Sequence, residues 1–497
     1  MSFLELAKSQ DKSLGIYLDK INRHGLIAGA TGTGKTISLK VLTEQLSDQG
    51  IPVFLADIKG DLASLAKSGL MEGKVAERVE SMGLTDFKNQ AYPVRLWDLF
   101  QEAGSPVRTT LTEMGPLLLG RLLDLNETQA GILSMAFRIA DDQGMALIDM
   151  KDLRALLQEM GDHASDYSSQ YGNITKQSIG AIQRSLLVLE DQGGDLFFGE
   201  PALDLRDFMQ VDSQGKGYIN ILMAQKLFQS PKLYSTFLLW MLSELFEVLP
   251  EVGDLPQPKM VFFFDEAHLL FKDAPKAFLE KIEQVVRLIR SKGVGIYFIT
   301  QNPADLPESI LAQLGNRIQH ALRAYTPKEI KAVKMAAESF RSNPAFKTEE
   351  VITELKVGEA LISCLNQEGQ PEVVERALIR PPQSYMGTLE DAEVSNLITN
   401  SSMEAKYRQA FDRESAFELL QQKVAKQAQE DQLAEERARL EKERQALEKE
   451  KERQATRRSP GRPAKSTAQK ATDSFFSSVT RTLGRELVRG LFGSLKK

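Results

Sequence analysis

The fold of this chain is decided by one stretch, Gly29-Ala30-Thr31-Gly32-Thr33-Gly34-Lys35-Thr36. These residues satisfy the pattern G-x-x-x-x-G-K-[ST], in which glycines let the backbone wrap closely around phosphate groups. Lys35 is placed to reach the β- and γ-phosphates of a nucleotide, and the Thr36 hydroxyl to bind Mg²⁺. We therefore predict a phosphate-binding loop (P-loop) and expect the eight residues and the following Ile37 to bind the nucleotide.

The sequence on both sides of the loop supports this prediction. Residues 24–28 have the apolar character of a short buried strand, and residues 37–46 that of a helix. A helix that starts at the loop points its partial positive charge toward the phosphates. The alternative, an ordinary glycine turn, requires neither the strand nor the helix.

A second acidic element is predicted to complete the site. Residues 261–264 form an apolar run that ends in Asp265 and Glu266. Open α/β sheets bind ligands at the carboxyl ends of their strands. We expect Asp265 to contact Mg²⁺ through water, since Mg²⁺ keeps part of its hydration shell. Glu266 is expected to orient and activate the attacking water. The alternative is a strand that happens to end in two acids.

Two more polar residues are candidates for catalysis. Gln301 ends the predicted strand 295–301, where it could sense the γ-phosphate or position the water; a helix-capping turn is the alternative. Arg290 lies near the end of a predicted helix over 276–292, where a cation could neutralise transition-state charge in a neighbouring subunit. A solvated helix arginine is the alternative. The predicted catalytic set is therefore Lys35, Glu266, Gln301 and Arg290.

Strands alternate with helices along the first 400 residues, which predicts an α/β fold with a mainly parallel sheet covered on both faces. Strands are expected near residues 51–56, 94–97, 218–222, 259–264, 295–301, 317–322, 359–365 and 372–378. Residues 117–249 are mainly helical in pattern, so we expect a large helical insertion over about 100–250.

Composition limits the class of protein. The 497 residues include one cysteine, Cys364, which we interpret as a buried strand thiol in a reducing compartment. No apolar run approaches the ~20 residues that a transmembrane helix needs, and the first ten residues lack the features of a secretory signal. These observations predict a cytoplasmic protein without a transmembrane segment.

The C-terminal part differs in character from the ATPase domain expected over 1–400. Residues 401–456 are predicted to form a charged helix; Leu433, Leu440 and Leu447 recur every seven residues, so a coiled coil and a lone helix both stay open. Residues 457–471 form a basic linker whose Pro-Gly-Arg-Pro segment is similar to an AT-hook. Residues 472–497 have the pattern of a basic amphipathic helix, which could dock on the ATPase body, on a partner or on an anionic membrane.

Several motifs together resemble one family. They are the P-loop, Asp57-Ile58-Lys59-Gly60-Asp61, the run from Leu122 to Gln129, Asp265-Glu266-Ala267-His268, and the run over 287–303 that ends in Thr-Gln-Asn-Pro. The chain is similar to the HerA–FtsK superfamily of P-loop ATPases, and most similar to the bacterial HerA-like helicase C-terminal domain proteins. The resemblance covers roughly residues 10–400 and most of the tail.

The resemblance implies a RecA-like core that hydrolyses ATP with Mg²⁺, assembled as a homo-hexameric ring with nucleotide between subunits. It also implies a catalytic Glu266, a sensor-like Gln301 and an intersubunit Arg290. HerA and FtsK relatives pump double-stranded DNA through the ring. However, neither the N-terminal β-barrel of archaeal HerA nor the DNA-reading C-terminal domain of FtsK is recognisable. DNA translocation is therefore a weaker implication than ATP hydrolysis.

Three classes of function remain open from the sequence. The first is an ATP-driven ring motor on duplex DNA, a helicase or translocase, with a nuclease or another protein as a partner. The second is a ring or assembly ATPase that acts on proteins without DNA. The third is a small-molecule kinase or a GTPase, since residues 57–60 imitate the GTPase D-x-x-G motif. The third class is disfavoured because no Asn-Lys-x-Asp guanine-reading motif is present.

Overall fold

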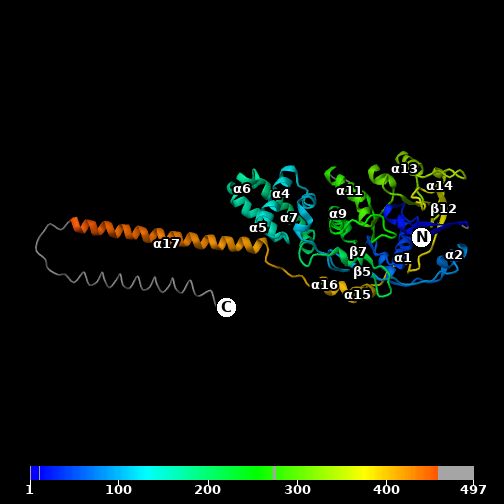
Figure 1. The fold of residues 1–497 in the computed structure, drawn as a ribbon, viewed down its shortest axis with the longest axis horizontal. Coiled ribbons are helices and arrows are strands. Elements are labelled where there is room, and N and C mark those ends of the chain that lie inside the picture. Colours follow the sequence, from blue (N-terminus) through cyan, green and yellow to red (C-terminus); the bar gives the residue numbers. More distant parts are fainter. Residues whose placement is uncertain (1, 11, 272–275, 457–497) are drawn as a thin grey trace. The chain divides into compact units, whose positions relative to one another are not determined.

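A twelve-stranded sheet forms the framework of the described part of the chain (Figure 1). The computed structural model describes residues 2–10, 12–271 and 276–456. Eight neighbouring strands are parallel. In spatial order they are β10 (Asn316–Gln319), β3 (Gly25–Ala28), β9 (Val294–Thr300), β8 (Met260–Phe264), β4 (Val53–Asp57), β7 (Ile219–Met223), β5 (Val94–Asp98) and β6 (Ser105–Pro106).

Four antiparallel strands extend the sheet beyond β10. They are β11 (Glu359–Ser363), β12 (Glu375–Ile379), β1 (Phe3–Ser9) and β2 (Lys12–Tyr17). The predicted α/β class with a mainly parallel sheet is confirmed. The sequence analysis did not predict β1, β2 or β6.

Both faces of the parallel strands are buried, because helices pack on each side. Phe262 and Phe264 of β8 belong to the core cluster on one face, whereas Val261 and Phe263 belong to the cluster on the other. The first face is covered by α9 (Pro231–Val248) and α11 (Lys276–Ile289). The second is covered by α1 (Lys35–Asp48), which leads away from the P-loop.

The predicted helical insertion follows β6. It contains α3 (Leu111–Leu122), α4 (Glu127–Asp142), α5 (Met150–Asp162), α6 (Ala164–Tyr171), α7 (Lys176–Asp191) and α8 (Gly194–Phe197). Figure 1 shows α4 to α7 gathered at one end of the compact unit that spans Met1–Gln421. The chain returns to the sheet through β7, at the position that the sequence predicted for a strand.

Shorter helices complete the described chain. They are α2 (Gly73–Ser81), α10 (His268–Phe271), α12 (Glu308–Leu311), α13 (Pro327–Glu338), α14 (Thr348–Glu354), α15 (Asp391–Thr399) and α16 (Ser402–Tyr407). Among the described residues, no helix combines the length and the apolar character needed to cross a bilayer.

The charged helix begins later than the sequence predicted. It is α17 (Ala416–Thr456), and a non-helical segment separates it from α16. The break coincides with a tertiary contact: the buried Asp152 carboxylate accepts hydrogen bonds from the Ser415 hydroxyl and the Phe417 amide. The described residues from Gln422 to Thr456 belong to a second unit. The predicted linker over 457–471 and amphipathic helix over 472–497 lie outside the described residues.

Candidate active site

The predicted P-loop connects β3 to α1. The helix begins at Lys35, directly after Gly34, whose φ of 118° lies in the left-handed region that favours glycine. A Cβ at Gly29 would lie 2.5 Å from the Cβ of His320, so a larger residue does not fit there. The loop therefore has a tightly wrapped backbone that ends at a helix N-terminus, as phosphate binding requires.

The nine predicted nucleotide-binding residues fall into two groups. Thr31, Gly32, Gly34, Lys35, Thr36 and Ile37 line a cavity of about 450 Å³. The other three hold the loop in place. The Gly29 amide donates to the Thr300 carbonyl at 3.2 Å, the Ala30 amide donates to the Ala321 carbonyl at 2.8 Å, and the Thr33 hydroxyl donates to the Ala30 carbonyl at 2.7 Å.

Lys35 curls back over the loop from which it starts. Its Nζ donates to the carbonyl oxygens of Gly29 at 2.6 Å and of Ala30 at 3.2 Å. Burial lowers the pKa of this ammonium group, while the negative charges of Asp265 and Glu266 act in the opposite direction. The structure therefore places the predicted lysine within the electrostatic reach of both predicted acids.

Asp265 lies at the carboxyl end of β8 and lines the same cavity as Lys35 and Thr36. Burial, together with the negative charge of the neighbouring Glu266, raises the pKa of Asp265 to about 6. The Glu266 amide donates to Asp265 Oδ1 at 2.9 Å and partly offsets this shift, as do the positive charges of Lys59 and Lys35.

The oxygen atoms of Thr36 and Asp265 are suitable ligands for Mg²⁺. The Thr36 hydroxyl and the Asp265 carboxylate line one cavity, and Mg²⁺ prefers a few oxygen ligands beside phosphates and water. A cation would also compensate the buried negative charge of Asp265, which the surrounding protein only partly neutralises. The residues present therefore fit the expected cofactor.

Glu266 has two polar neighbours. Gln301 Nε2 lies 3.4 Å from both carboxylate oxygens, and His268 Nδ1 lies 3.4 Å from Oε2. Gln301 is close because it follows β9, the parallel neighbour of β8. Glu266 has a φ of 47°, a left-handed conformation that is unusual for glutamate. Strained backbones of this kind are found at functional sites.

Arg290 lies away from this group. It begins η5 (Arg290–Lys292), which precedes β9, whereas Gln301 follows β9. A seven-residue strand is roughly 20 Å long at ~3.3 Å per residue, so Arg290 is at the opposite end of the sheet. Its Nη2 donates to Asp254 Oδ1 at 2.9 Å. Arg290 is therefore not brought to Lys35 of its own chain, and its intersubunit role stays a prediction.

His320 supports the P-loop, a role that the sequence did not indicate. It follows β10 and is fully buried. Its Nδ1 lies 3.0 Å from the Glu359 carbonyl, so this nitrogen donates, and Nε2 accepts from the Ser38 hydroxyl at 2.8 Å. Burial lowers the pKa of His320 to about 4, so the ring is neutral at pH 7. A single histidine without neighbouring ligands carries no signal of this role in sequence.

The residues that imitate the GTPase D-x-x-G motif, 57–60, form a turn at the end of β4. The Asp57 carboxylate accepts hydrogen bonds from the amides of Gly60 at 2.6 Å and Leu62 at 2.8 Å, so it shapes the turn. Lys59 and Asp61 line the nucleotide cavity. Both belong to a motif that carries the family resemblance, but neither was assigned a role from the sequence.

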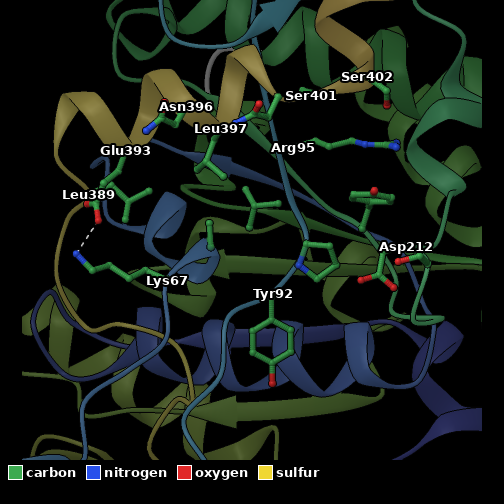
Figure 2. Close-up of a pocket in the computed structure, with 16 residues that line it drawn as sticks. Lys67, Tyr92, Arg95, Asp212, Leu389, Glu393, Asn396, Leu397, Ser401 and Ser402 are labelled. Carbon is green, nitrogen blue, oxygen red and sulfur yellow. Dashed lines mark hydrogen bonds and ion pairs between the residues drawn. The ribbon is translucent and has the colours of Figure 1, made fainter.

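A further cavity lies away from this site (Figure 2). It measures about 770 Å³ and lies against the start of β5 and one side of α15. Figure 2 shows Lys67 and Glu393 paired across it, with Nζ 2.7 Å from Oε1. At the other side of the cavity, the guanidinium carbon Cζ of Arg95 lies 3.6 Å from the centre of the Tyr218 ring. None of the predicted catalytic residues lines this cavity.

The arrangement of loop, acids and sheet agrees with a comparison against family models. The model for the helicase HerA-like C-terminal family matches residues 3–497. The chain belongs to this family. The resemblance inferred from the sequence is thereby confirmed, and the protein is a P-loop ATPase that uses Mg²⁺ with ATP. No curated protein matches the sequence.

The comparison with solved structures finds matches at low sequence identity. The plasmid coupling protein TrwB, in complex with the non-hydrolysable GTP analogue GDPNP, is 13% identical with a TM-score of 0.50. The match covers 78% of this chain and 93% of that chain. VirB4 of Thermoanaerobacter pseudethanolicus is 17% identical with a TM-score of 0.49, covering 76% of this chain and 96% of its own. At these identities the likeness concerns the fold alone.

Proposed function

We propose that this HerA-like protein is a cytoplasmic, homo-hexameric ring ATPase that moves along or remodels double-stranded DNA. One observation carries the ATPase part of the proposal: Lys35, Thr36 and Asp265 line one cavity, and Glu266 directly follows Asp265. Family membership supports the coupling to DNA, because the description of the family names a helicase. A nuclease or another protein partner would act with such a motor.

Each residue has a proposed role in hydrolysis. The Lys35 ammonium exchanges its two carbonyl contacts for oxygens of the β- and γ-phosphates, where it neutralises negative charge. The Thr36 hydroxyl and, through water, the Asp265 carboxylate would hold Mg²⁺, which would supply further positive charge beside the phosphates. Glu266 orients the attacking water and accepts its proton, and Gln301 positions the Glu266 carboxylate at 3.4 Å.

Arg290 is proposed to act in a neighbouring subunit. Its position at the opposite end of the sheet from Lys35 means that it can serve only another chain's nucleotide. Cations supplied in trans accelerate nucleotide hydrolysis by about 10³–10⁵-fold. The proposal therefore requires a ring in which the end of the sheet that carries Arg290 faces the P-loop of the next subunit.

The charge distribution favours a second candidate, an ATPase that remodels proteins. The ten basic and two acidic residues after residue 456 leave the rest of the chain with a net charge of −14. An acidic body repels the phosphate backbone of DNA, which is normally met by basic surfaces. DNA binding would then depend on a local basic surface or on the basic tail.

Measurement of ATP turnover separates the two candidates. Size-fractionated hexamer would be assayed alone and with duplex DNA, single-stranded DNA and RNA at fixed salt. We expect duplex DNA to stimulate turnover, and Glu266→Gln to remove both basal and stimulated turnover. If duplex DNA leaves turnover of the active hexamer unchanged, the DNA motor is contradicted and the protein-remodelling candidate is favoured.

A further inference from the structure

Arg290 shares a carboxylate with a second arginine at the end of the sheet opposite the P-loop. Its Nη2 lies 2.9 Å from Asp254 Oδ1 and 3.3 Å from Oδ2. Arg23 ends η1 (Leu18–Arg23), and its Nη2 lies 3.6 Å from the same Oδ2. We call Arg23, Asp254 and Arg290 the arginine cluster. Its two guanidinium groups and one carboxylate leave one positive charge in excess.

The loop that carries Asp254 is fastened to the segment that carries Arg290. The amides of Val252 and Gly253 both donate to the Ser291 carbonyl, at 2.8 and 3.2 Å. Gly253 has a φ of 69°, in the left-handed region that favours glycine, and this lets the loop turn beside η5. The backbones of Asp254 and Arg290 are therefore held side by side by short-range hydrogen bonds.

The segment that carries Arg23 is fastened to the same part of the fold. His24, the next residue, is buried. Its Nδ1 accepts from the Ile296 amide at 3.0 Å, so Nε2 donates to the Val286 carbonyl at 2.9 Å. Val286 belongs to α11 and Ile296 to β9, the elements directly before and after η5. Arg23 therefore stays beside Arg290 unless these buried hydrogen bonds break.

The carboxylate compensates repulsion between the two arginines. Burial lowers the pKa of Arg23, and the positive charge of Arg290 lowers it as well, whereas Asp254 raises it. The hydrogen bond from Arg290 holds the pKa of Asp254 below its usual range, so this carboxyl is ionised at neutral pH. Without Asp254, two like charges would remain side by side, and their repulsion would move the partly exposed Arg290 side chain away from Arg23.

Stability alone does not account for the arginine cluster. The Asp254 side chain is 66% exposed, and ion pairs that are this exposed add little to the free energy of unfolding. The carboxylate instead restricts the directions that the Arg290 side chain can take. Among the described residues, only Nη2 of Arg290 has a hydrogen-bonding partner, so its other N–H groups are available to phosphate oxygens.

We propose that Asp254 is a positioning residue, which holds the Arg290 guanidinium in the direction needed to reach the nucleotide of a neighbouring subunit. The inference rests on the proposed role of Arg290 in trans and adds the group that orients it. Orientation has a large effect on rate, because a displacement of about 1 Å can slow catalysis roughly 10²-fold.

The test compares variants of the full-length, size-fractionated hexamer. Asp254→Ala removes the carboxylate, and Asp254→Glu keeps a carboxylate on a longer side chain. Glu251→Ala is the matched control, because it removes an exposed acid from the same loop outside the arginine cluster. Phosphate release gives turnover at saturating ATP with Mg²⁺, calorimetry gives ATP affinity, and thermal unfolding gives stability.

We expect Asp254→Ala to lower turnover about tenfold or more, with ATP affinity and melting temperature close to those of the wild type. Asp254→Glu should recover part of the lost turnover, and Glu251→Ala should match the wild type. Asp254→Ala subunits mixed with Glu266→Gln subunits should exceed the summed turnover of the two separate variants. In such rings, Glu266→Gln subunits supply a well-oriented Arg290 to the intact nucleotide sites of Asp254→Ala subunits.

Several results would overturn the inference. They are wild-type or faster turnover by Asp254→Ala, loss of its assembly, stability or ATP affinity, and no gain on mixing at any ratio. The variant Arg290→Ala separates this inference from the proposed function. If Arg290→Ala also keeps the wild-type rate, the role of Arg290 in trans is wrong and the inference fails with it. If Arg290→Ala is inactive while Asp254→Ala is fully active, only the positioning role of Asp254 is wrong.

Discussion

Replacement of Asp265 by asparagine should stabilise the nucleotide-free protein at neutral and alkaline pH. Burial and Glu266 raise the pKa of Asp265 from 3.8 to about 6. A carboxyl whose pKa is raised on folding favours the folded state less once it ionises. The shift of roughly two units corresponds to about 3 kcal/mol of lost stability above pH 6, at ~1.36 kcal/mol per unit. Asparagine keeps the shape and the Oδ1 acceptor but never ionises.

Thermal unfolding measures this effect. An unfolding entropy of about 2.1 cal/mol/K per residue, over the 421 residues of the compact unit, converts ~3 kcal/mol to about 3 °C. At pH 8 the Asp265→Asn variant should therefore melt about 3 °C above the wild type. The difference should shrink as the pH falls through 6 toward 4, because the wild-type carboxyl becomes neutral.

A control and the addition of ligand complete the test. Asp86→Asn removes an exposed carboxylate and should leave the melting temperature nearly unchanged. Mg²⁺ with ATP should stabilise the wild type more than Asp265→Asn, because the variant lacks a negative charge near the cation. If Asp265→Asn melts at or below the wild type at pH 8, or if its advantage does not depend on pH, the pKa of Asp265 is not raised by burial in the way described above.

Four other predictions concern nucleotide binding and hydrolysis. Lys35→Ala should abolish productive ATP binding in calorimetry, and normal turnover would contradict the P-loop assignment. Glu266→Gln should still bind ATP but hydrolyse it about 10²–10⁴-fold more slowly in a phosphate-release assay; a wild-type rate would exclude Glu266 as the water-orienting residue. Arg290→Ala subunits mixed with Glu266→Gln subunits should regain part of the activity if the arginine acts in trans, and a lack of recovery at every ratio would count against this. His320→Ala leaves the Ser38 hydroxyl and the Glu359 carbonyl without their partner and should weaken ATP and triphosphate binding alike; unchanged affinity for both would show that the loop keeps its shape without the ring.

The parallel part of the sheet was predictable because its signals are local. The strand before Gly29 and the strand before Asp265 are continuous apolar runs, and each ends at a residue with recognisable chemistry. Strands β1 and β2 were missed because they are short, do not alternate regularly between buried and exposed residues, and contain no motif. Strand β1 pairs with β2 on one side and, on the other, with β12, which lies more than 350 residues away in the chain.

The candidate site was predictable only where chemistry is written into residue type and spacing. Lys35, Thr36 and Asp265 meet at one cavity because parallel strands end at the same edge of the sheet. The contribution of His320 depends on distant segments folding against the P-loop, and this residue belongs to no spacing pattern. Arg290 is a different case, because it lies at the opposite end of the sheet from Lys35 and its role in a neighbouring subunit stays a prediction.

The segment over 381–386 limits how short a working fragment of this protein can be. The buried Glu44 carboxylate takes its hydrogen bonds from Gln383 and Ser384, which follow the last strand of the sheet. A recombinant piece trimmed just after β12 would leave this carboxylate without donors, at a cost of several kcal/mol. Ser415 and Phe417 hold Asp152 in the same way. The shortest soluble ATPase suitable for crystallisation is therefore expected to extend to about residue 421, well past the end of its sheet.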